Sequence, residues 1–166
     1  AKALPLGDPR KPEPVVLGSV IGMSTVQHCN ALVDDALAKG ARLLCGGKAD
    51  STLMPATVLD HVTPAMRIYH EETFGPVKCI VRVRGIEEAI ACANDNEYGL
   101  SAAVFGKDIA RAFNVARKID SGICHVNGPT VHDEAQMPFG GVKGSGIGRF
   151  GGKAGIAEFT ELRWVT

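Results

Sequence analysis

A regular alternation of strand-like and helix-like segments in the middle of the chain constrains the fold more than any other feature of the sequence. PVKCIVRV (76–83), LSAAVFG (100–106) and GICHVN (122–127) have the apolar and β-branched composition of strands. Apolar residues at helical spacing separate them, over 86–93 and over 108–120. Strands joined by such helical crossovers pair in parallel, so the sequence predicts an α/β fold with a largely parallel sheet and flanking helices.

Capping residues predict where the helices begin and end. An earlier amphipathic helix is expected to start at the S-x-x-Q capping box of Ser24 and Gln27 and to stop at Gly40. Asp108 is a suitable N-cap for the helix over 108–120. The apolar face of that second helix is predicted to consist of Ala112, Phe113, Ala116 and Ile119.

The two ends of the chain are predicted to be less regular. Residues 1–16, rich in Pro and Gly, form an extended lead-in, followed later by short strands in ARLLCGG (41–47) and TLMPATVL (52–59). AEFTELRWVT (157–166) mixes apolar and charged residues in a β-prone stretch. It is suited to pair with a distant sheet edge, although a strand in the chain's own sheet fits equally well. The predicted division is an α/β domain over 1–156 and a closing strand over 157–166.

Composition excludes some classes of partner. The 166 residues carry eighteen basic and eighteen acidic side chains without a basic stripe. Neither nucleic acid nor an anionic membrane surface is therefore an expected partner, because both require an electrostatic footprint. No apolar run reaches the length of about 18–20 residues that a membrane span needs.

The cysteines do not indicate a metal site or a disulfide framework. Their number, five, is odd, their spacings are wide, and no C-x-x-C or His/Cys cluster occurs. Cys45, Cys79 and Cys124 stand within apolar runs. We expect reduced, mostly buried cysteines in a cytoplasmic protein, and no bound metal.

The most unusual segment is PFGGVKGSGIGRFGG (138–152), in which nearly half the residues are glycine. Residues 146–151 match G-x-G-x-x-G, the dinucleotide fingerprint, which functions between a buried strand and a helix N-terminus. Here MPFGGVKGS precedes the match and GKAGIAEF (152–159) follows, a poor helix opening. The sequence therefore predicts a structural loop and no phosphate site.

Several motifs in fixed order point to a known family. HEETFGPV (70–77), NDNEYGLSA (94–102), VNGPTVHDEAQMPFGG (126–141) and the glycine run follow one another along the chain. In this order they resemble the C-terminal part of the catalytic domain of the aldehyde dehydrogenase superfamily, and the resemblance covers essentially the whole chain. The wording of the third motif is most similar to members acting on aromatic aldehydes, the vanillin, benzaldehyde and salicylaldehyde dehydrogenases.

The resemblance implies an NAD(P)-dependent oxidation of an aldehyde to a carboxylic acid. In the family a cysteine thiolate attacks the aldehyde, hydride passes to NAD or NADP, and a Glu-activated water hydrolyses the thioester. None of the five cysteines here follows Gly-Gln, as the family's nucleophile does. The nucleophile and the general-base Glu are therefore expected upstream of Ala1, and residues 1–166 alone should be inactive.

The resemblance also assigns candidate binding residues. Glu72 matches the Glu that holds the nicotinamide ribose hydroxyls, and Phe74 matches the aromatic beside the nicotinamide; otherwise they are a solvated loop Glu and a core Phe. Phe139 matches a residue lining the substrate tunnel, and His132 would border the tunnel mouth as an acid, a base or only a solvated loop histidine. Arg149 is followed by Phe150 and not by the Glu that many members have, so no proton relay is assigned there, and Arg149 is expected to hold the loop or an interface.

Two functions remain open from the sequence. In the first, the chain is part of an aldehyde dehydrogenase that forms a homo-oligomer, a dimer or a tetramer, through the closing strand. In the second, it is a non-catalytic interaction module that docks onto a full-length relative through the same strand. In the first case the glycine run lets the chain turn beside the substrate tunnel and cross toward the oligomerisation sheet.

Overall fold

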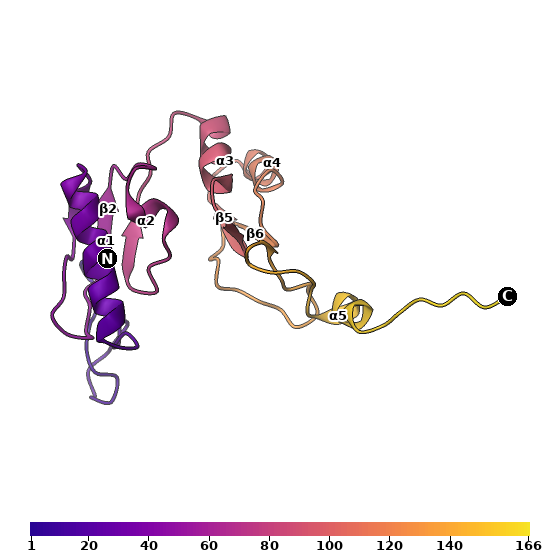
Figure 1. The fold of residues 1–166 in the computed structure, drawn as a ribbon, viewed down its shortest axis with the longest axis horizontal. Coiled ribbons are helices and arrows are strands. Elements are labelled where there is room, and N and C mark those ends of the chain that lie inside the picture. Colours follow the sequence, from indigo (N-terminus) through magenta and orange to yellow (C-terminus); the bar gives the residue numbers. More distant parts are fainter. The chain divides into compact units, whose positions relative to one another are not determined.

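A computed structural model describes residues 1–166 and confirms the predicted α/β fold class. The chain divides into two compact units, Ala1–Arg82 and Val83–Thr166 (Figure 1). None of the helices has the length and apolar character that crossing a membrane requires.

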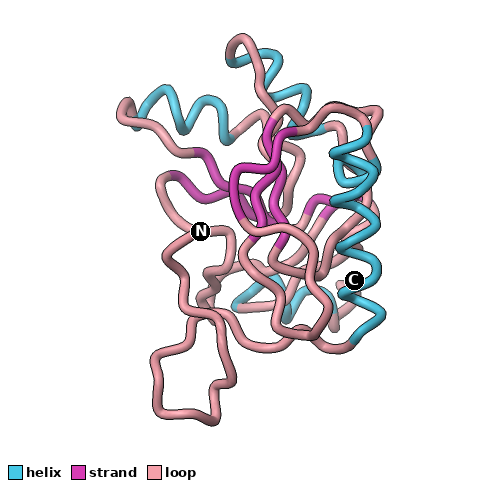
Figure 2. Tube along the Cα trace, turned by 90° about the vertical axis from the view of Figure 1, so that its left-hand side faces the viewer, coloured by secondary structure: helices cyan, strands magenta, loops and turns pink.

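The first unit is built on a three-stranded sheet. Its elements are α1 (Met23–Ala38), β1 (Arg42–Cys45), β2 (Thr57–Asp60), α2 (Arg67–His70) and β3 (Val77–Cys79). The sheet order is β1-β2-β3, with β1 antiparallel and β3 parallel to the central strand β2. The strands are short and joined by long loops, as the magenta and pink segments of Figure 2 show. The strand predicted over 52–59 is formed only at its end, since β2 begins at Thr57.

One face of α1 supplies much of the core of this unit. Val26, Cys29, Leu32, Val33 and Ala36 are all buried and recur at the spacing of one helix face. They belong to the same cluster as Leu59 of β2 and Val77 of β3. Burying a side chain the size of Leu stabilises a fold by about 1.5–3 kcal/mol, so this face fixes how α1 lies on the sheet.

The N-terminal cap of α1 differs from the prediction, whereas its C-terminal end agrees. The N-cap is Gly22, and no side chain caps the helix there. Ser24 lies inside the first turn, so the predicted capping box does not form. At the other end the N–H of Gly40 bonds the Leu37 carbonyl at 3.1 Å, and the φ of Gly40 is +97°. That left-handed conformation suits glycine and ends the helix as predicted.

Helix α2 was not predicted, because four residues are too few to show a periodicity. It forms through contacts with α1 and the core. The Arg67 backbone N–H donates to Asp35 Oδ2 of α1 at 2.8 Å, and Ile68 is buried. The flanking Met66 is also buried. Tertiary contacts therefore place this turn where the sequence suggested only a loop.

The second unit contains a parallel crossover. Its elements are α3 (Ile86–Asn94), β4 (Tyr98–Gly99), β5 (Ser101–Val104), α4 (Ile109–Ala116), β6 (Ile123–Val126), β7 (Val142–Lys143) and α5 (Gly152–Glu158). Strands β5 and β6 pair in parallel, and β4 pairs antiparallel with β7. The predicted crossover β5–α4–β6 is thus confirmed. Strand β3 pairs with β2 and not with β5, because apolar composition identifies a strand without identifying its partner.

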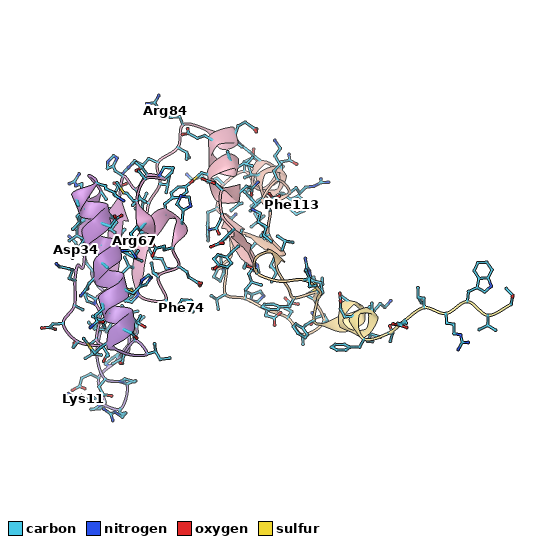
Figure 3. All side chains as sticks on the ribbon, viewed as in Figure 1. Lys11, Asp34, Arg67, Phe74, Arg84 and Phe113 are labelled. Atoms are coloured by element: carbon cyan, nitrogen blue, oxygen red, sulfur yellow. The ribbon has the colours of Figure 1, made fainter.

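Helix α4 begins as predicted and buries the predicted face, with the exception of Phe113. The Asp108 carboxylate accepts a hydrogen bond from the Arg111 N–H at 3.0 Å, which confirms the N-cap. The helix ends at Ala116, earlier than predicted. Ala112 and Ala116 are buried, whereas Phe113 is 55% exposed and points outward from α4 (Figure 3). Small residues face the strands there, and the ring predicted for the core lies on the surface.

Two asparagines from the recognised motifs hold the loops of this unit. The Asn127 side chain donates to the Gly106 carbonyl at 2.9 Å and accepts from the Gly106 N–H at 2.8 Å, which joins the ends of β5 and β6. The Asn94 side chain donates to the Lys118 carbonyl and accepts from the Asp120 N–H, both at 2.8 Å. These contacts satisfy loop backbone groups that would otherwise lack partners.

The C-terminal region departs from the prediction. Residues 157 and 158 lie in α5, a helix that was not expected after the glycine run. Residues 160–166 form neither a helix nor a strand within this chain. Leu162 and Trp164 are 105% and 88% exposed, respectively. A strand in this segment therefore stays a prediction, because it would need a sheet edge to pair with. The division into domains over 1–156 and 157–166 also stays a prediction.

No disulfide joins any of the five cysteines, and most of them are not fully buried. Only Cys29 is completely buried, whereas Cys45, Cys92 and Cys124 are half-buried and Cys79 is exposed. The expectation of mostly buried cysteines is therefore wrong for this chain. Apolar neighbours in sequence did not ensure burial, because a short strand such as β3 can expose one face.

A buried carboxylate joins the end of β2 to the end of the first unit. Asp60 is 2% exposed, and Arg82 donates to both of its oxygens, at 2.9 and 2.6 Å. The His61 N–H donates to the same group at 2.8 Å. Chiefly through the Arg82 hydrogen bonds, the pKa of Asp60 falls to about 2.

We predict that Asp60 contributes to the acid sensitivity of the protein. A carboxyl with a depressed folded-state pKa stabilises the fold above its unfolded pKa of about 3.9, and this contribution is lost as the pH falls toward about 2. Asp60→Asn should lower the free energy of unfolding at neutral pH and flatten its fall over that acidic window, as measured by urea unfolding at several pH values.

Asp34→Asn is the matched control, because Asp34 pairs with Lys48 in an ion pair whose two side chains are each 56% exposed. Its loss should change stability little. An unchanged acid slope in Asp60→Asn would show that Asp60 is not tied to Arg82 in solution.

Candidate functional site

Two of the predicted site residues, Glu72 and Phe74, lie on the loop between α2 and β3. Both are exposed, Phe74 to 77%. Figure 3 labels Phe74 on this loop. Phe74 has a φ of +46°, in the left-handed region that side chains with a Cβ avoid. A strained residue with an exposed ring is a marker of functional sites, although it does not by itself identify a ligand.

The same two residues line an open pocket of about 440 Å³. Its walls come from the start of α1 and from the loop: Ile21, Ser24, Thr25, His28, Glu72, Thr73 and Phe74. Sequence reasoning found the loop residues through their motif and missed those of α1. No motif joins the two segments, which lie more than forty residues apart, so only the fold brings them together.

Two neighbouring residues of α1 bond two neighbouring carbonyls of the loop. His28 Nε2 lies 2.9 Å from the Glu72 carbonyl oxygen, so this nitrogen must carry the proton that is donated. The Cys29 thiol donates to the Thr73 carbonyl at 3.2 Å. Burial raises the pKa of Cys29, which keeps it a protonated thiol and thus a donor.

Gly75 completes the contact between α1 and the loop. A Cβ at position 75 would stand 2.5 Å from the Cys29 sulfur, which is too close for any side chain. The Thr73 hydroxyl also bonds the Gly75 carbonyl at 3.3 Å. Glycine is thus needed here for close approach of the loop backbone to α1.

The two adjacent glutamates of the loop motif have different environments. Arg67 binds the Glu71 carboxylate through two nitrogens, at 2.6 and 2.8 Å, and its hydrogen bonds lower the pKa of Glu71. Glu72 instead lines the pocket. Of the pair, Glu71 has a structural partner, and Glu72 is the carboxylate available to a ligand.

The pocket suits a ligand that combines hydroxyl groups with a flat ring. An exposed carboxylate accepts hydrogen bonds from two neighbouring hydroxyls, and Ser24 and Thr25 add hydroxyl donors and acceptors. The exposed Phe74 ring offers a surface for stacking. A ribose carries such neighbouring hydroxyls and a nicotinamide is such a flat ring, so these side chains could hold this portion of a dinucleotide.

In the second unit Phe139 lies in a small strand-like bridge. Its backbone pairs with Phe150, with N–H to carbonyl distances of 2.8 and 2.7 Å. Phe139 is half-buried. Arg149 donates to the Gly141 and Gly148 carbonyls, each at 2.7 Å, and so holds the loop as predicted.

His132 contacts Glu134 and His125. Its Nε2 is 3.5 Å from a carboxylate oxygen of Glu134, and its ring meets the His125 ring edge-on at 5.8 Å. His125 Nε2 is buried without a hydrogen-bond partner. The structure therefore brings His132 together with Glu134 and His125, while Phe139 pairs with Phe150.

The glycine run packs against its own chain. A Cβ at Gly151 would collide with the Met137 carbonyl, and one at Gly152 would stand 2.5 Å from the Gln136 carbonyl. Carbonyl oxygens repel phosphate. The expectation of a poor helix opening was wrong, because α5 begins at Gly152, yet the glycines of this segment serve backbone packing.

Neither Cys29 nor Cys124 has the features of an activated nucleophile, and the chain shows no metal cluster. Burial raises the pKa of Cys29 and of Cys124, which disfavours the reactive thiolate. No group of three or more His, Cys, Asp or Glu side chains is placed to hold a metal ion.

A second pocket, which the sequence did not indicate, lies in the second unit. It has a volume of about 470 Å³ and is lined from α3, α4 and the end of β5, including Phe105, Lys107 and Arg111. Its residues belong to ordinary amphipathic elements, so no motif marked it.

An α/β chain that exposes a carboxylate and an aromatic ring at an open pocket is typical of a domain that binds a small polar ligand. A family model described as the aldehyde dehydrogenase family matches residues 1–165. The chain belongs to the aldehyde dehydrogenase family.

Similar proteins include two that act on aromatic aldehydes by name. The chain is 58% identical to a vanillin dehydrogenase of Pseudomonas sp. strain HR199, over 96% of this chain and 33% of that protein. It matches a salicylaldehyde dehydrogenase of Pseudomonas putida G7, solved with salicylaldehyde, at 50% identity and a TM-score of 0.93, over 98% of this chain and 34% of that one.

A second similar structure is an aldehyde dehydrogenase of Mycobacterium tuberculosis complexed with NAD+. The identity is 34% and the TM-score 0.87, over 96% of this chain and 34% of that one. The chain spans about a third of the length of the curated relatives it matches.

We predict that Gly75→Ala destabilises the protein by about 1–3 kcal/mol, because the new methyl group overlaps the Cys29 sulfur. Adding Cys29→Ala should remove most of this penalty. Urea unfolding of the two single variants and the double variant measures this coupling. Gly18→Ala is the control, since only atoms of Pro9, at 3.9 Å, approach its added Cβ. Strictly additive effects of Gly75→Ala and Cys29→Ala would contradict the close contact.

Proposed function

We propose that this chain serves in the NAD(P)-dependent oxidation of an aromatic aldehyde to its carboxylic acid. The observation that carries the proposal is the pocket shared by Glu72 and Phe74, in a chain that belongs to the aldehyde dehydrogenase family. The names of the similar vanillin and salicylaldehyde dehydrogenases support an aromatic substrate.

In this proposal Glu72 and Phe74 hold one end of the dinucleotide. The Glu72 carboxylate accepts hydrogen bonds from both ribose hydroxyls, and the Phe74 ring packs beside the nicotinamide. When bound, the dinucleotide accepts the hydride that leaves the substrate. The residues of this chain orient it and exclude water from one side.

Phe139 and His132 are proposed to line the aldehyde site. The Phe139 ring would provide an apolar wall for an aromatic substrate. His132, with Glu134 at 3.5 Å, would place a polar group at the mouth of the site. The pairing of Phe139 with Phe150 and the ring contact of His132 with His125 support fixed positions for both residues.

The attacking cysteine and the general-base Glu are proposed to lie outside residues 1–166. None of the five cysteines follows Gly-Gln, as the family's nucleophile does, and burial raises the pKa of Cys29 and of Cys124, which disfavours the thiolate in those two. The polypeptide of residues 1–166 alone should therefore form no reduced dinucleotide from NAD⁺ and salicylaldehyde.

The segment from 160 to 166 is proposed to add a strand to a sheet edge of another copy of the protein. Its backbone forms no strand within this chain, and its apolar side chains Leu162, Trp164 and Val165 are 77% exposed or more. Such a segment gains backbone hydrogen bonds and apolar burial when it pairs with a second chain.

We predict that Glu72→Gln raises the KM for NAD⁺ about tenfold or more, because a neutral amide replaces charge-assisted hydrogen bonds to the ribose. Steady-state kinetics with salicylaldehyde, on the protein as its gene encodes it, give this value. Glu71→Gln is the matched control, since the Glu71 carboxylate is bound by Arg67. Equal effects of the two substitutions would refute the proposed role of Glu72.

We predict that Trp164→Glu weakens assembly, because it places a charge on the segment proposed to pair between copies. Light scattering coupled to size-exclusion chromatography should show a shift toward the monomer. Ile147→Glu, at a residue that is 101% exposed outside this segment, should leave the assembly unchanged. An unaltered mass for Trp164→Glu would count against assembly through the last strand.

A further inference from the structure

We infer that His28 and Cys29 are positioning residues: one turn of α1 holds the carbonyls of Glu72 and Thr73 and thereby fixes the direction of the Glu72 carboxylate and the Phe74 ring. As far as the dinucleotide is concerned, the inference rests on the proposed function. We call these two hydrogen bonds, His28 to Glu72 and Cys29 to Thr73, the α1 clamp.

The clamp follows from the order of the contacts. Adjacent residues of a rigid helix bond adjacent carbonyls of the loop, at 2.9 and 3.2 Å. Each carbonyl belongs to one planar peptide unit, so two successive peptide planes are held. The peptide plane between Thr73 and Phe74 contains the nitrogen and the Cα of Phe74, so holding this plane also holds the start of the Phe74 residue.

The clamp explains how Phe74 keeps an unfavourable conformation. A φ of +46° at a residue with a Cβ persists only where the surroundings impose it. The Phe74 ring is 77% exposed, so its own packing does not impose the conformation. The neighbouring contacts do: the clamp lies on one side, and on the other is Gly75, where a Cβ would stand 2.5 Å from the Cys29 sulfur.

His28 and Cys29, the two donors of the α1 clamp, belong to a helix that packs against the core. Cys29 is 0% exposed and belongs to the core cluster together with Leu32 and Val33. His28 stands beside it at the edge of the pocket. Displacing the loop would therefore require movement of a buried helix face, whereas loss of either donor releases only the loop.

The test uses near-isosteric variants in the protein as its gene encodes it. His28→Phe keeps a ring and removes the donor, and His28→Gln keeps a donor. We expect His28→Phe to raise the KM for NAD⁺ about threefold to tenfold and to leave the KM for salicylaldehyde within about twofold. His28→Gln should restore most of the affinity. Cys29→Ala and Cys29→Ser form the corresponding pair.

Hydrogen exchange gives a readout that does not depend on the dinucleotide. In His28→Phe the amides of residues 73–75 and of Val77 should exchange about threefold to tenfold faster, with the rest of α1 unchanged. Gln27→Ala, at an exposed neighbour on α1, is the control and should alter neither quantity.

The outcomes separate the two claims. If Glu72→Gln raises the KM for NAD⁺ while His28→Phe and Cys29→Ala change neither KM nor exchange, the clamp is overturned. If exchange accelerates in the clamp variants while Glu72→Gln leaves the KM for NAD⁺ unchanged, the clamp is supported and the proposed function fails. A fall in melting temperature alone, with exchange and KM unchanged, also overturns the clamp.

Discussion

Burial of one face of α1 is the constraint on which the first unit depends. Five side chains of that face leave water together and fix the rotation of the helix against β2 and β3. Because the rotation is fixed, the neighbouring residue His28 must stand at the edge of the pocket. The hydrophobic core therefore determines which side chains of α1 meet the loop of Glu72 and Phe74, although none of those core residues lines the pocket.

Much of the fold could be predicted from the sequence, and the errors have physical causes. Periodicity found α1, α3, α4, β5 and β6, because long or strongly patterned segments carry their own signal. Helix α2 was not predicted, because contacts with Asp35 and with the core stabilise it and the local sequence does not. Helix α5 was not predicted, because the glycines at its start suggest a break in helical structure. The structure requires glycine there, since a Cβ would meet the carbonyls of Gln136 and Met137.

The site could be predicted only in part. Glu72 and Phe74 were found because a motif surrounds them, and they do share a pocket. Their functions, like those of Phe139 and His132, stay predictions. His28 had no motif, and a histidine beside a buried cysteine on an amphipathic helix gives no sign that its ring reaches a carbonyl of a loop more than forty residues away. Side chains that act on a distant backbone are visible only once the tertiary fold places the two segments together.

At position 74 two requirements conflict: the left-handed backbone conformation of Phe74 lowers the stability of the fold, whereas its side chain presents an exposed ring. Glycine, which adopts this conformation without a steric cost, would relax the loop. Asparagine would do so in part. A laboratory selection for thermal tolerance alone should therefore drift toward these residues and discard the aromatic ring. A selection of the same variants for catalytic turnover should retain phenylalanine. The residue found at position 74 would therefore show which of the two selections had been applied.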